Sequence, residues 1–385
     1  MENIAEYKEI VDIIKEKGGE AFKYCYQCGK CDVVCPWNLL IKFSMRKIVR
    51  QAVFGMSEIE EEEIWRCTTC GKCVINCPRD VQQIVSGTAL RRMATEFGIF
   101  PGTATPIRSI RSSLQADGNP FYEERSKRAD WAKDHSVSDF TEDMEILYFP
   151  GCYPSYDPRL KKVAVATAGI LNKAGVTFGI LGEKESCCGE SIRKTGDEEL
   201  FVQLAKENIK TFIDNGVKRI LVSSPHCYHT FKNEYPEFMV HFEIVHITQY
   251  LAELVNDGRL ELKKKYKKKV TYHDPCYLGR HNNIFDEPRN ILRQIPGLKF
   301  VEMPYAMEES LCCGGGGGRI WMDTPKGERL SDLRIEQAVN VKAEILATSC
   351  PYCIANFEDS RLYCKGGEDI EIKDITEIVW DLLDV

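Results

Sequence analysis

The spacing of its cysteines constrains this chain more than any other feature. Eighteen of the 385 residues are cysteine, and eight of these lie in two runs of the form Cys-x2-Cys-x2-Cys-x3-Cys-Pro, which close at Cys35 and Cys77. The formal net charge of −7 argues against a nucleic-acid partner, which would require a basic surface. The acidic first residues do not resemble a signal peptide, so we expect a cytoplasmic protein. Cysteines in a reducing compartment are rarely disulfides, and here they indicate metal ligands.

The two runs predict two 4Fe–4S clusters. Three thiolates spaced two residues apart surround one face of a cubane, and the fourth cysteine of each run reaches the other cluster. A structural zinc is the alternative, but two complete motifs that each end in Cys-Pro argue against it. The predicted ligands are Cys25, Cys28, Cys31 and Cys77 for cluster 1, and Cys67, Cys70, Cys73 and Cys35 for cluster 2.

The region around these runs is expected to be helical. Apolar residues recur at helical spacing over 41–52 and again over 81–97. We therefore predict a helical two-cluster ferredoxin domain over 1–99. Residues 100–143 are rich in proline and glycine and mixed in charge, so we expect an irregular linker there.

The remainder of the chain is an internal repeat. Cys187-Cys188-Gly189 corresponds to Cys312-Cys313-Gly314, and the cysteines before and after them are repeated at similar offsets. Each copy alternates short apolar stretches with helical ones, which is typical of α/β units with parallel sheets. The predicted helices cover 160–174, 198–215, 288–294 and 327–343. The expected fold is thus α + α/β, with tandem α/β domains over 144–262 and 263–385.

The second copy carries one cysteine more than a cubane requires. Five thiolates leave either a spare thiol or a cluster in which some thiolates bridge irons. The glycines of 314–318 remove every Cβ beside this site, so backbone can approach closely and adopt positive φ. A phosphate-binding loop is the alternative, but Arg319-Ile320 stand where it needs Lys and Ser or Thr. The five cysteines of this copy are Cys276, Cys312, Cys313, Cys350 and Cys353.

The first copy departs from this pattern, because Ser224 stands where the second copy has Cys350. Its four cysteines could hold an iron–sulfur cluster or a zinc ion, or the site could be empty. His226 and His229 could substitute as ligands or could be ordinary surface histidines. The four cysteines are Cys152, Cys187, Cys188 and Cys227.

Other polar residues are weaker candidates. His273 and Asp274 precede Cys276, and with His281 they could supply the proton that a released thiol needs, or they could merely fix a turn. Cys364 lies outside the repeat and is expected to be a free cysteine. The lysine-rich run 263–269 is expected to be a solvated linker; the alternative is a docking patch for an acidic partner.

The motif Cys-x35-Cys-Cys-x36-Cys-Pro-Tyr-Cys resembles the cysteine-rich CCG domain of heterodisulfide reductases. A ferredoxin domain followed by two CCG domains resembles the whole of the D subunit of heterodisulfide reductase, or its C and B subunits fused. The resemblance implies that the five cysteines of the second copy hold a noncubane 4Fe–4S cluster that cleaves a disulfide. It also implies an oxidoreductase component that receives electrons through the two cubanes. Dependence on several oxygen-labile clusters suggests that the chain comes from an anaerobe.

Two other functions stay open. The iron–sulfur subunits of benzoyl-CoA reductase and dehydrogenase complexes resemble this chain too, which implies an electron relay without substrate chemistry; a cluster scaffold or redox sensor is the third class. No G-x-G-x-x-G motif follows a predicted strand, so electrons must come from a partner. The expected partners are a flavoprotein, a hydrogenase, a ferredoxin or a membrane cytochrome, and the last would place the chain at the membrane surface.

Overall fold

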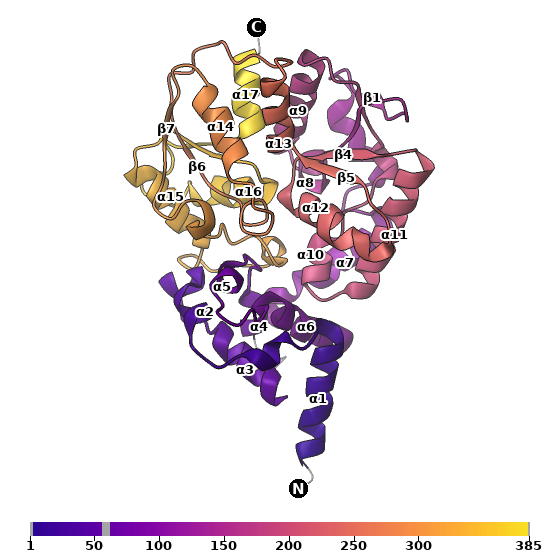
Figure 1. Ribbon diagram of the computed structural model, residues 1–385, viewed down its shortest axis with the longest axis vertical. Coiled ribbons are helices and arrows are strands. Elements are labelled where there is room, and N and C mark those ends of the chain that lie inside the picture. The colour runs from indigo at the N-terminus through magenta and orange to yellow at the C-terminus, as the bar shows by residue number, and fades with distance from the viewer. Residues whose placement is uncertain (1–2, 56–61, 384–385) are drawn as a thin grey trace. The chain divides into compact units, whose positions relative to one another are not determined.

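The structure is a computed structural model that describes residues 3–55 and 62–383 (Figure 1). It separates into two compact units, and each unit is built from three stretches of the sequence. Unit 1 comprises Met1–Ser109, Ser191–Phe201 and Gly314–Leu330, and unit 2 comprises Ile110–Glu190, Val202–Cys313 and Ser331–Val385. Each unit is described by itself.

Unit 1 is helical, as the apolar spacing predicts. Its three longer helices pack against one another and bury residues such as Ile48, Ala52 and Ala89. Val85 and Phe97 belong to the predicted apolar row but are 40% and 64% exposed, so only part of that row faces the core. The helices are α1 (Asn3–Gly18), α2 (Lys30–Val33), α3 (Met45–Phe54), α4 (Glu63–Arg66), α5 (Lys72–Ile75), α6 (Gln83–Glu96) and α10 (Glu190–Lys194).

Residues 100–143 are more ordered than the irregular linker that the sequence predicts. They contain α7 (Pro106–Asp117), a 3₁₀ helix (Arg125–Ala132) and β1 (Ser138–Asp139). Pro106 is the first residue of α7, a position where proline starts a helix rather than breaking it. The buried residues of α7 include Ile107, Ile110 and Leu114, which share one helical face.

Unit 2 contains two parallel sheets, as the alternating pattern predicts. Every strand pair in the two sheets is parallel. The first sheet has the order β1-β3-β2-β4-β5 and the second β7-β6-β8-β9. The strands are β2 (Ile146–Phe149), β3 (Phe178–Ile180), β4 (Arg219–Val222), β5 (Glu243–His246), β6 (Lys269–Tyr272), β7 (Lys299–Val301), β8 (Ile345–Thr348) and β9 (Glu371–Asp374).

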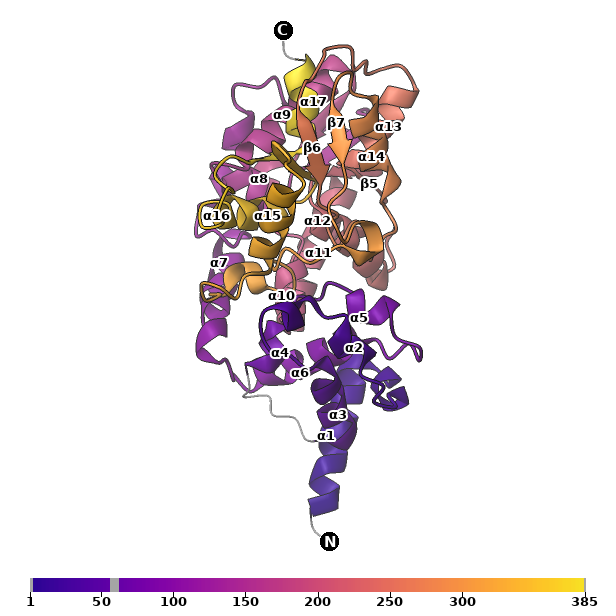
Figure 2. The same cartoon turned by 90° about the vertical axis from the view of Figure 1, so that its left-hand side faces the viewer.

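The helices of unit 2 join the two sheets into one hydrophobic core. Helix α9 packs against α17 and α13 packs against α14, so each contact joins one copy to the other (Figures 1 and 2). A Cβ on Gly169 of α9 would lie 2.5 Å from the ring of Trp380 of α17, so only glycine permits this approach. The helices are α8 (Cys152–Tyr156), α9 (Lys161–Lys173), α11 (Glu198–Asp214), α12 (Pro225–His229), α13 (Ile247–Asn256), α14 (Asp286–Gln294), α15 (Leu330–Asn340), α16 (Pro351–Ser360) and α17 (Ile375–Leu383).

The strand order places the repeated cysteines together. The direction of winding reverses between β2 and β4 in the first sheet and between β6 and β8 in the second. Open parallel sheets bind ligands at the carboxyl ends of the strands beside such a reversal. Cys152 and Cys227 follow β2 and β4, and Cys276 and Cys350 follow β6 and β8.

Within residues 3–55 and 62–383, we find no helix that combines the length and the apolar character needed to cross a bilayer.

Candidate iron–sulfur sites

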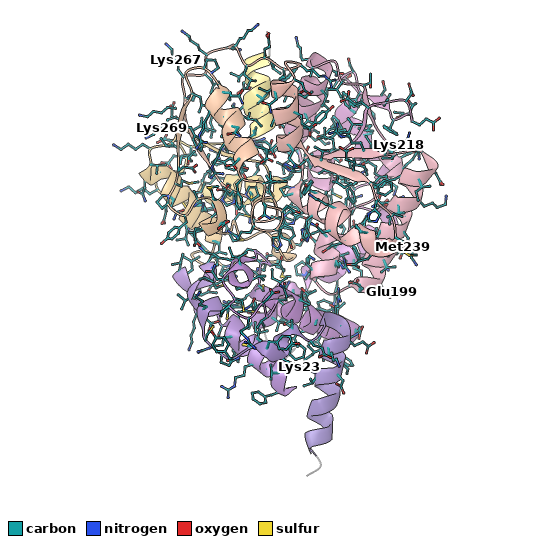
Figure 3. All side chains as sticks on the ribbon, viewed as in Figure 1. Lys23, Glu199, Lys218, Met239, Lys267 and Lys269 are labelled. Carbon is teal, nitrogen blue, oxygen red and sulfur yellow. The ribbon has the colours of Figure 1, made fainter. Side chains whose placement is uncertain are left out.

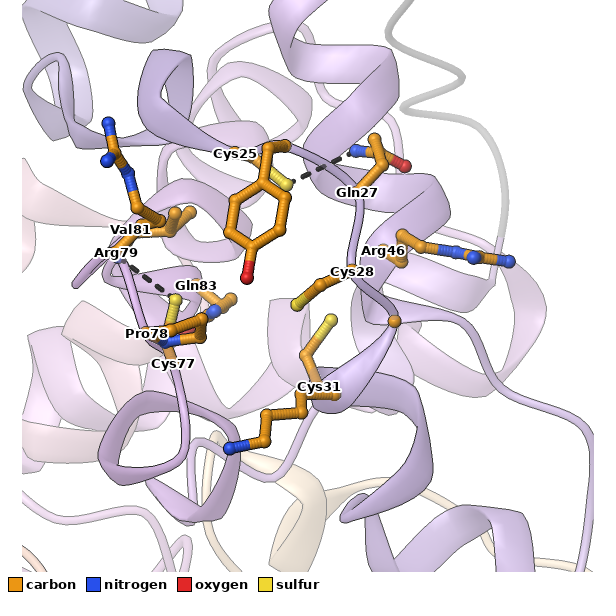
Figure 4. Close-up of a pocket in the computed structure, with 13 residues that line it drawn as sticks. Cys25, Gln27, Cys28, Cys31, Arg46, Cys77, Pro78, Arg79, Val81 and Gln83 are labelled. Carbon is orange, nitrogen blue, oxygen red and sulfur yellow. Dashed lines mark hydrogen bonds between the residues drawn. The ribbon is translucent and has the colours of Figure 1, made fainter.

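The first site in unit 1 is a pocket lined by one predicted set of ligands (Figure 4). Two nitrogens contact the ligand sulfurs: Nε2 of Gln27 lies 3.2 Å from Sγ of Cys25, and the amide of Val81 lies 3.4 Å from Sγ of Cys77. N–H groups aimed at sulfur stabilise the charge of a bound cluster. The cysteines that line the pocket are Cys25, Cys28, Cys31 and Cys77.

The second site in unit 1 is a pocket lined by the other predicted set. The amide of Thr69 donates to Sγ of Cys67 at 3.4 Å. Cys31 lines both pockets, so the two sites are neighbours. The structure thus brings the fourth cysteine of each run to the other site, and this second pocket is lined by Cys35, Cys67, Cys70 and Cys73 in addition to Cys31.

The two runs reach this geometry through the same local fold. Helices α2 and α5 each begin after a left-handed glycine, Gly29 with φ of 82° and Gly71 with φ of 80°. A side chain at either position would strain the turn that gathers the cysteines. Burial and the adjacent Asp32 raise the pKa of Cys31 to about 12. Metal ligation requires thiolates, so loading this all-sulfur site must release protons.

The second CCG site in unit 2 is wholly buried. Sγ of Cys353 lies 3.3 Å from Sγ of Cys313, and the thiols of Cys350 and Cys353 interact. Cys350 is the N-cap residue of α16 but makes no capping bond with its sulfur, which is therefore available as a ligand. The five cysteines of this copy, none more than 7% exposed, are Cys276, Cys312, Cys313, Cys350 and Cys353.

The structure places the predicted proton donors in different surroundings. A ring nitrogen of His273 and the sulfurs of Cys313 and Cys353 all lie within 4.8 Å of one another. Burial, reinforced by Arg334, lowers the pKa of His273 well below its ordinary value. Asp274 is held by two bonds from Arg289, at 2.6 and 2.9 Å. The role of either residue as a proton donor stays a prediction.

The first CCG site keeps its four cysteines together in unit 2. The thiol of Cys152 interacts with that of Cys187, and the thiol of Cys188 interacts with those of Cys187 and Cys227. Ser224 has a different role from Cys350, because its Oγ accepts a bond from the amide of His226 and caps α12. The cysteines that the structure brings together here are Cys152, Cys187, Cys188 and Cys227.

His229, His281 and Cys364 are three further residues that the sequence analysis considered. His229 is bonded to Asn233 and lies 5.2 Å from His281, ring centre to ring centre. His281 is stacked on Tyr277, with the ring centres 4.4 Å apart. Cys364 is half-buried, and its Sγ lies 3.8 Å from the carbonyl oxygen of Asp332.

Arg128 is the residue of the first site that the sequence did not reveal. Its Nη1 lies 3.6 Å from Sγ of Cys152, and its Nε donates to Glu185 at 3.0 Å. Arg128 and Glu185 are each 1% exposed. A buried cation beside a thiolate balances the negative charge of a sulfur-rich site. Arg128 lies in the segment expected to be a linker, and no spacing rule connects it to a cysteine motif.

The glycines of the second copy contact the second ferredoxin motif within unit 1. A Cβ on Gly316 would lie 2.4 Å from the carbonyl oxygen of Thr68, and one on Gly317 would lie 2.5 Å from that of Cys67. Arg91 fixes the contact, because it donates to the carbonyls of both Cys67 and Gly317, at 2.6 and 2.9 Å. The glycine run therefore serves close backbone approach, as the sequence predicts, and its neighbour here is a ferredoxin loop.

Two known sequence families match the chain. The cysteine-rich domain called CCG matches residues 146–232 and 270–358, and the 4Fe-4S dicluster domain matches residues 21–81. Among curated proteins, the D subunit of the dihydromethanophenazine:CoB–CoM heterodisulfide reductase of Methanosarcina barkeri is 32% identical, over 93% of this chain and 93% of its own length.

Two further relatives are longer proteins. The probable iron-sulfur-binding oxidoreductase FadF of Bacillus subtilis is 39% identical over 83% of this chain, and the EtfAB:quinone oxidoreductase of Syntrophomonas wolfei is 35% identical over 92% of it. The matches span 46% and 53% of those proteins, so this chain corresponds to about half of each. A crystal structure of a hypothetical protein from Helicobacter pylori has a similar fold, with a TM-score of 0.50 and 10% identity over 89% of this chain and 66% of that one.

Proposed function

Because the chain belongs to the family of CCG-domain iron–sulfur oxidoreductases with a 4Fe–4S dicluster domain, which includes the D subunit of heterodisulfide reductase, we propose that it reduces a disulfide within a multi-subunit redox complex. Electrons would enter at the ferredoxin motifs and be used at the second CCG site. The observation that carries this proposal is the 3.3 Å contact of Cys313 with Cys353, together with Cys276 and Cys350, which follow the two strands between which the strand order reverses.

The chemistry that bound clusters supply is one-electron transfer. A disulfide takes up two electrons and two protons and gives two thiols. The eight ferredoxin cysteines would hold two cubanes, and the five cysteines of the second copy would hold a noncubane 4Fe–4S cluster. For the first CCG site we propose an iron–sulfur cluster or a zinc ion, supported by four sulfurs in contact and by the cation of Arg128.

The glycine run supports transfer between the ferredoxin motifs and the second CCG site. It follows Cys312-Cys313 directly in the chain, and its residues Gly316 and Gly317 lie against the backbone of Cys67 and Thr68. Because glycine has no side chain, the run contributes only backbone atoms to this contact. The ligand loop of the second ferredoxin site and the ligand loop of the CCG site are thereby linked by a few covalent bonds and one backbone contact.

The surface around the first ferredoxin site supports entry of electrons from an acidic redox partner, such as a ferredoxin or flavoprotein. Cys28 is exposed, so this site reaches the surface of unit 1. Residues 21–55 contain a single acidic residue, Asp32, in a chain whose net charge is −7. The exposed basic residues of the same stretch are Lys23, Lys30, Lys42, Arg46, Lys47 and Arg50.

We expect the double substitution Lys23→Glu/Lys30→Glu to slow reduction of the chain by an acidic ferredoxin by about tenfold or more at low salt. Charge reversal removes the attraction that steers the encounter, and the difference should vanish at high salt because ions screen it. Stopped-flow absorbance at a series of salt concentrations measures the rate.

The matched control reverses two charges of the lysine-rich run in unit 2, Lys265→Glu/Lys267→Glu; the side chain of Lys267 extends from the loop before β6 (Figure 3). This control variant should behave like the native chain. The opposite pattern, with the control slowed and the first variant unaffected, would locate the partner on that run instead.

The substrate class is tested by mixing the anaerobically reduced chain with a panel of disulfides, including the mixed disulfide of coenzymes M and B. We expect at least one disulfide to oxidise the chain and release two thiols for each two electrons taken. If none does so while a ferredoxin still exchanges electrons rapidly, the disulfide proposal is wrong.

In that case the chain is a relay that feeds a separate catalytic component. The favouring observation is that FadF and the EtfAB:quinone oxidoreductase are about twice as long as the part that resembles this chain. In this second candidate function the partners are a flavoprotein, a hydrogenase or a membrane cytochrome, and the last would hold the chain at a membrane.

A further inference from the structure

His226 belongs to the first CCG domain, yet its side chain serves the second. Its Nδ1 lies 3.2 Å from Oε1 of Glu190, and both residues are buried, with side chains 5% and 1% exposed. The ring lies against Tyr352, two residues after Cys350 of the other copy, and Cys350 interacts with the ring electrostatically. Nδ1 faces Glu190, which leaves Nε2 as the nitrogen that can face the sulfur of Cys350.

Two tyrosines of the second copy fix the plane of this ring. The centre of the His226 ring lies 4.3 Å from that of Tyr277 and 4.3 Å from that of Tyr352, with interplanar angles of 31° and 30°. A ring held between two others and anchored at one nitrogen has little freedom to turn. The direction of its second N–H is therefore set by the packing.

The asymmetry between the copies is what makes this contact specific. His226 corresponds in the repeat to Tyr352, and Ser224 corresponds to Cys350. The first copy thus lacks the additional cysteine and instead supplies a buried histidine that interacts with that cysteine in its neighbour. Glu190, which orients the ring, follows Cys187-Cys188-Gly189, at the place where the second copy has Gly315.

We propose that His226 is a positioning residue of the second CCG site, which donates an N–H···S hydrogen bond to Cys350 while Glu190 holds its other nitrogen. The inference rests on the proposed function only in that the second site carries an iron–sulfur cluster. Hydrogen bonds to ligand sulfurs stabilise the more negative, reduced state of a cluster and raise its reduction potential.

The test compares His226→Phe with the native chain. Phenylalanine keeps a ring between Tyr277 and Tyr352 but has no N–H, so packing is retained while the hydrogen bond is lost. We expect the reduced-to-oxidised ratio of the second CCG cluster at a fixed potential to fall about tenfold, which is ~59 mV for one electron. A redox titration followed by electron paramagnetic resonance measures this without substrate or partner.

Two further variants separate the hydrogen bond from general disruption. His226→Gln restores an N–H donor and should recover part of the shift. His229→Gln removes a histidine one turn later, whose partners include Asn233 and Asn282, and should leave the potential unchanged. Iron analysis accompanies each variant, and if His226→Phe loses iron, His226→Gln and Glu190→Gln carry the comparison.

Potentials and spectra that are the same in all iron-loaded variants would overturn the inference and reduce His226 to a packing residue. A native chain without any signal from the second CCG site would instead overturn the proposed function. The two failures are thus distinguishable in one set of titrations.

Discussion

Cys313→Ser should lose about four iron atoms per chain, because the second CCG site can no longer hold its cluster. Cys313 is only 4% exposed, and its Sγ lies 3.3 Å from Sγ of Cys353. We therefore expect the sulfur of Cys313 to be one of the cluster ligands. The two ferredoxin sites lie in unit 1 and use other cysteines, so their spectra should persist. Iron analysis and low-temperature electron paramagnetic resonance, both done anaerobically, measure the two quantities.

The matched control is Cys364→Ser. Cys364 lies outside the repeat, and its Sγ is 3.8 Å from the carbonyl oxygen of Asp332. This variant should retain the iron content of the native chain, roughly 12 atoms if the first CCG site holds no iron. A Cys313→Ser protein with native iron content and spectrum would show that the second copy does not hold a cluster through this residue.

Arg128→Met should lower the free energy of unfolding by about 3–5 kcal/mol. The substitution leaves Glu185 as an uncompensated charge at 1% exposure, and it removes the cation 3.6 Å from Cys152. Burial already raises the pKa of Glu185 in spite of Arg128, so without Arg128 the carboxylate should take up a proton or admit water. Anaerobic urea unfolding, followed by circular dichroism, measures the loss.

Two controls distinguish this effect from simple loss of charge. The double variant Arg128→Met/Glu185→Gln removes both charges and should recover much of the stability, because a buried pair is costly mainly when one partner is left alone. Lys127→Ala breaks the neighbouring pair with Glu123, where both side chains are nearly half exposed, and should cost less than about 1 kcal/mol. If Arg128→Met also lowers the free energy of unfolding by less than about 1 kcal/mol, water compensates the charge of Glu185 and the prediction is wrong.

The sequence predicts most of the fold because its signals are local or repeated. The helical spacing over 41–52 corresponds to α3, the repeat corresponds to two parallel sheets, and the predicted helix over 198–215 corresponds to α11. The prediction for 100–143 differs from the structure because proline breaks a helix in its interior but starts one at its first turn, and Pro106 has the second role in α7.

Contacts between distant residues are beyond such reasoning. Arg128 is 24 residues from Cys152 along the chain, and its charge is buried only because the 3₁₀ helix over 125–132 packs against α8. The position of His226 beside Cys227 makes it a candidate ligand for its own copy. Only the packing of the two copies places its ring between Tyr277 and Tyr352 of the other copy.

The sequence by itself determined which cysteines form groups of candidate metal ligands, because the spacing of thiolates around a small inorganic cluster is a local constraint on the backbone. It also determined the two parallel α/β copies, because a periodic apolar pattern must bury one face. Tertiary structure alone decided which charged and polar side chains meet those sulfurs. The position of the His226 ring between Tyr277 and Tyr352 and that of Arg128 beside Cys152 depend on side-chain direction and on packing between elements, and neither leaves a period in the sequence.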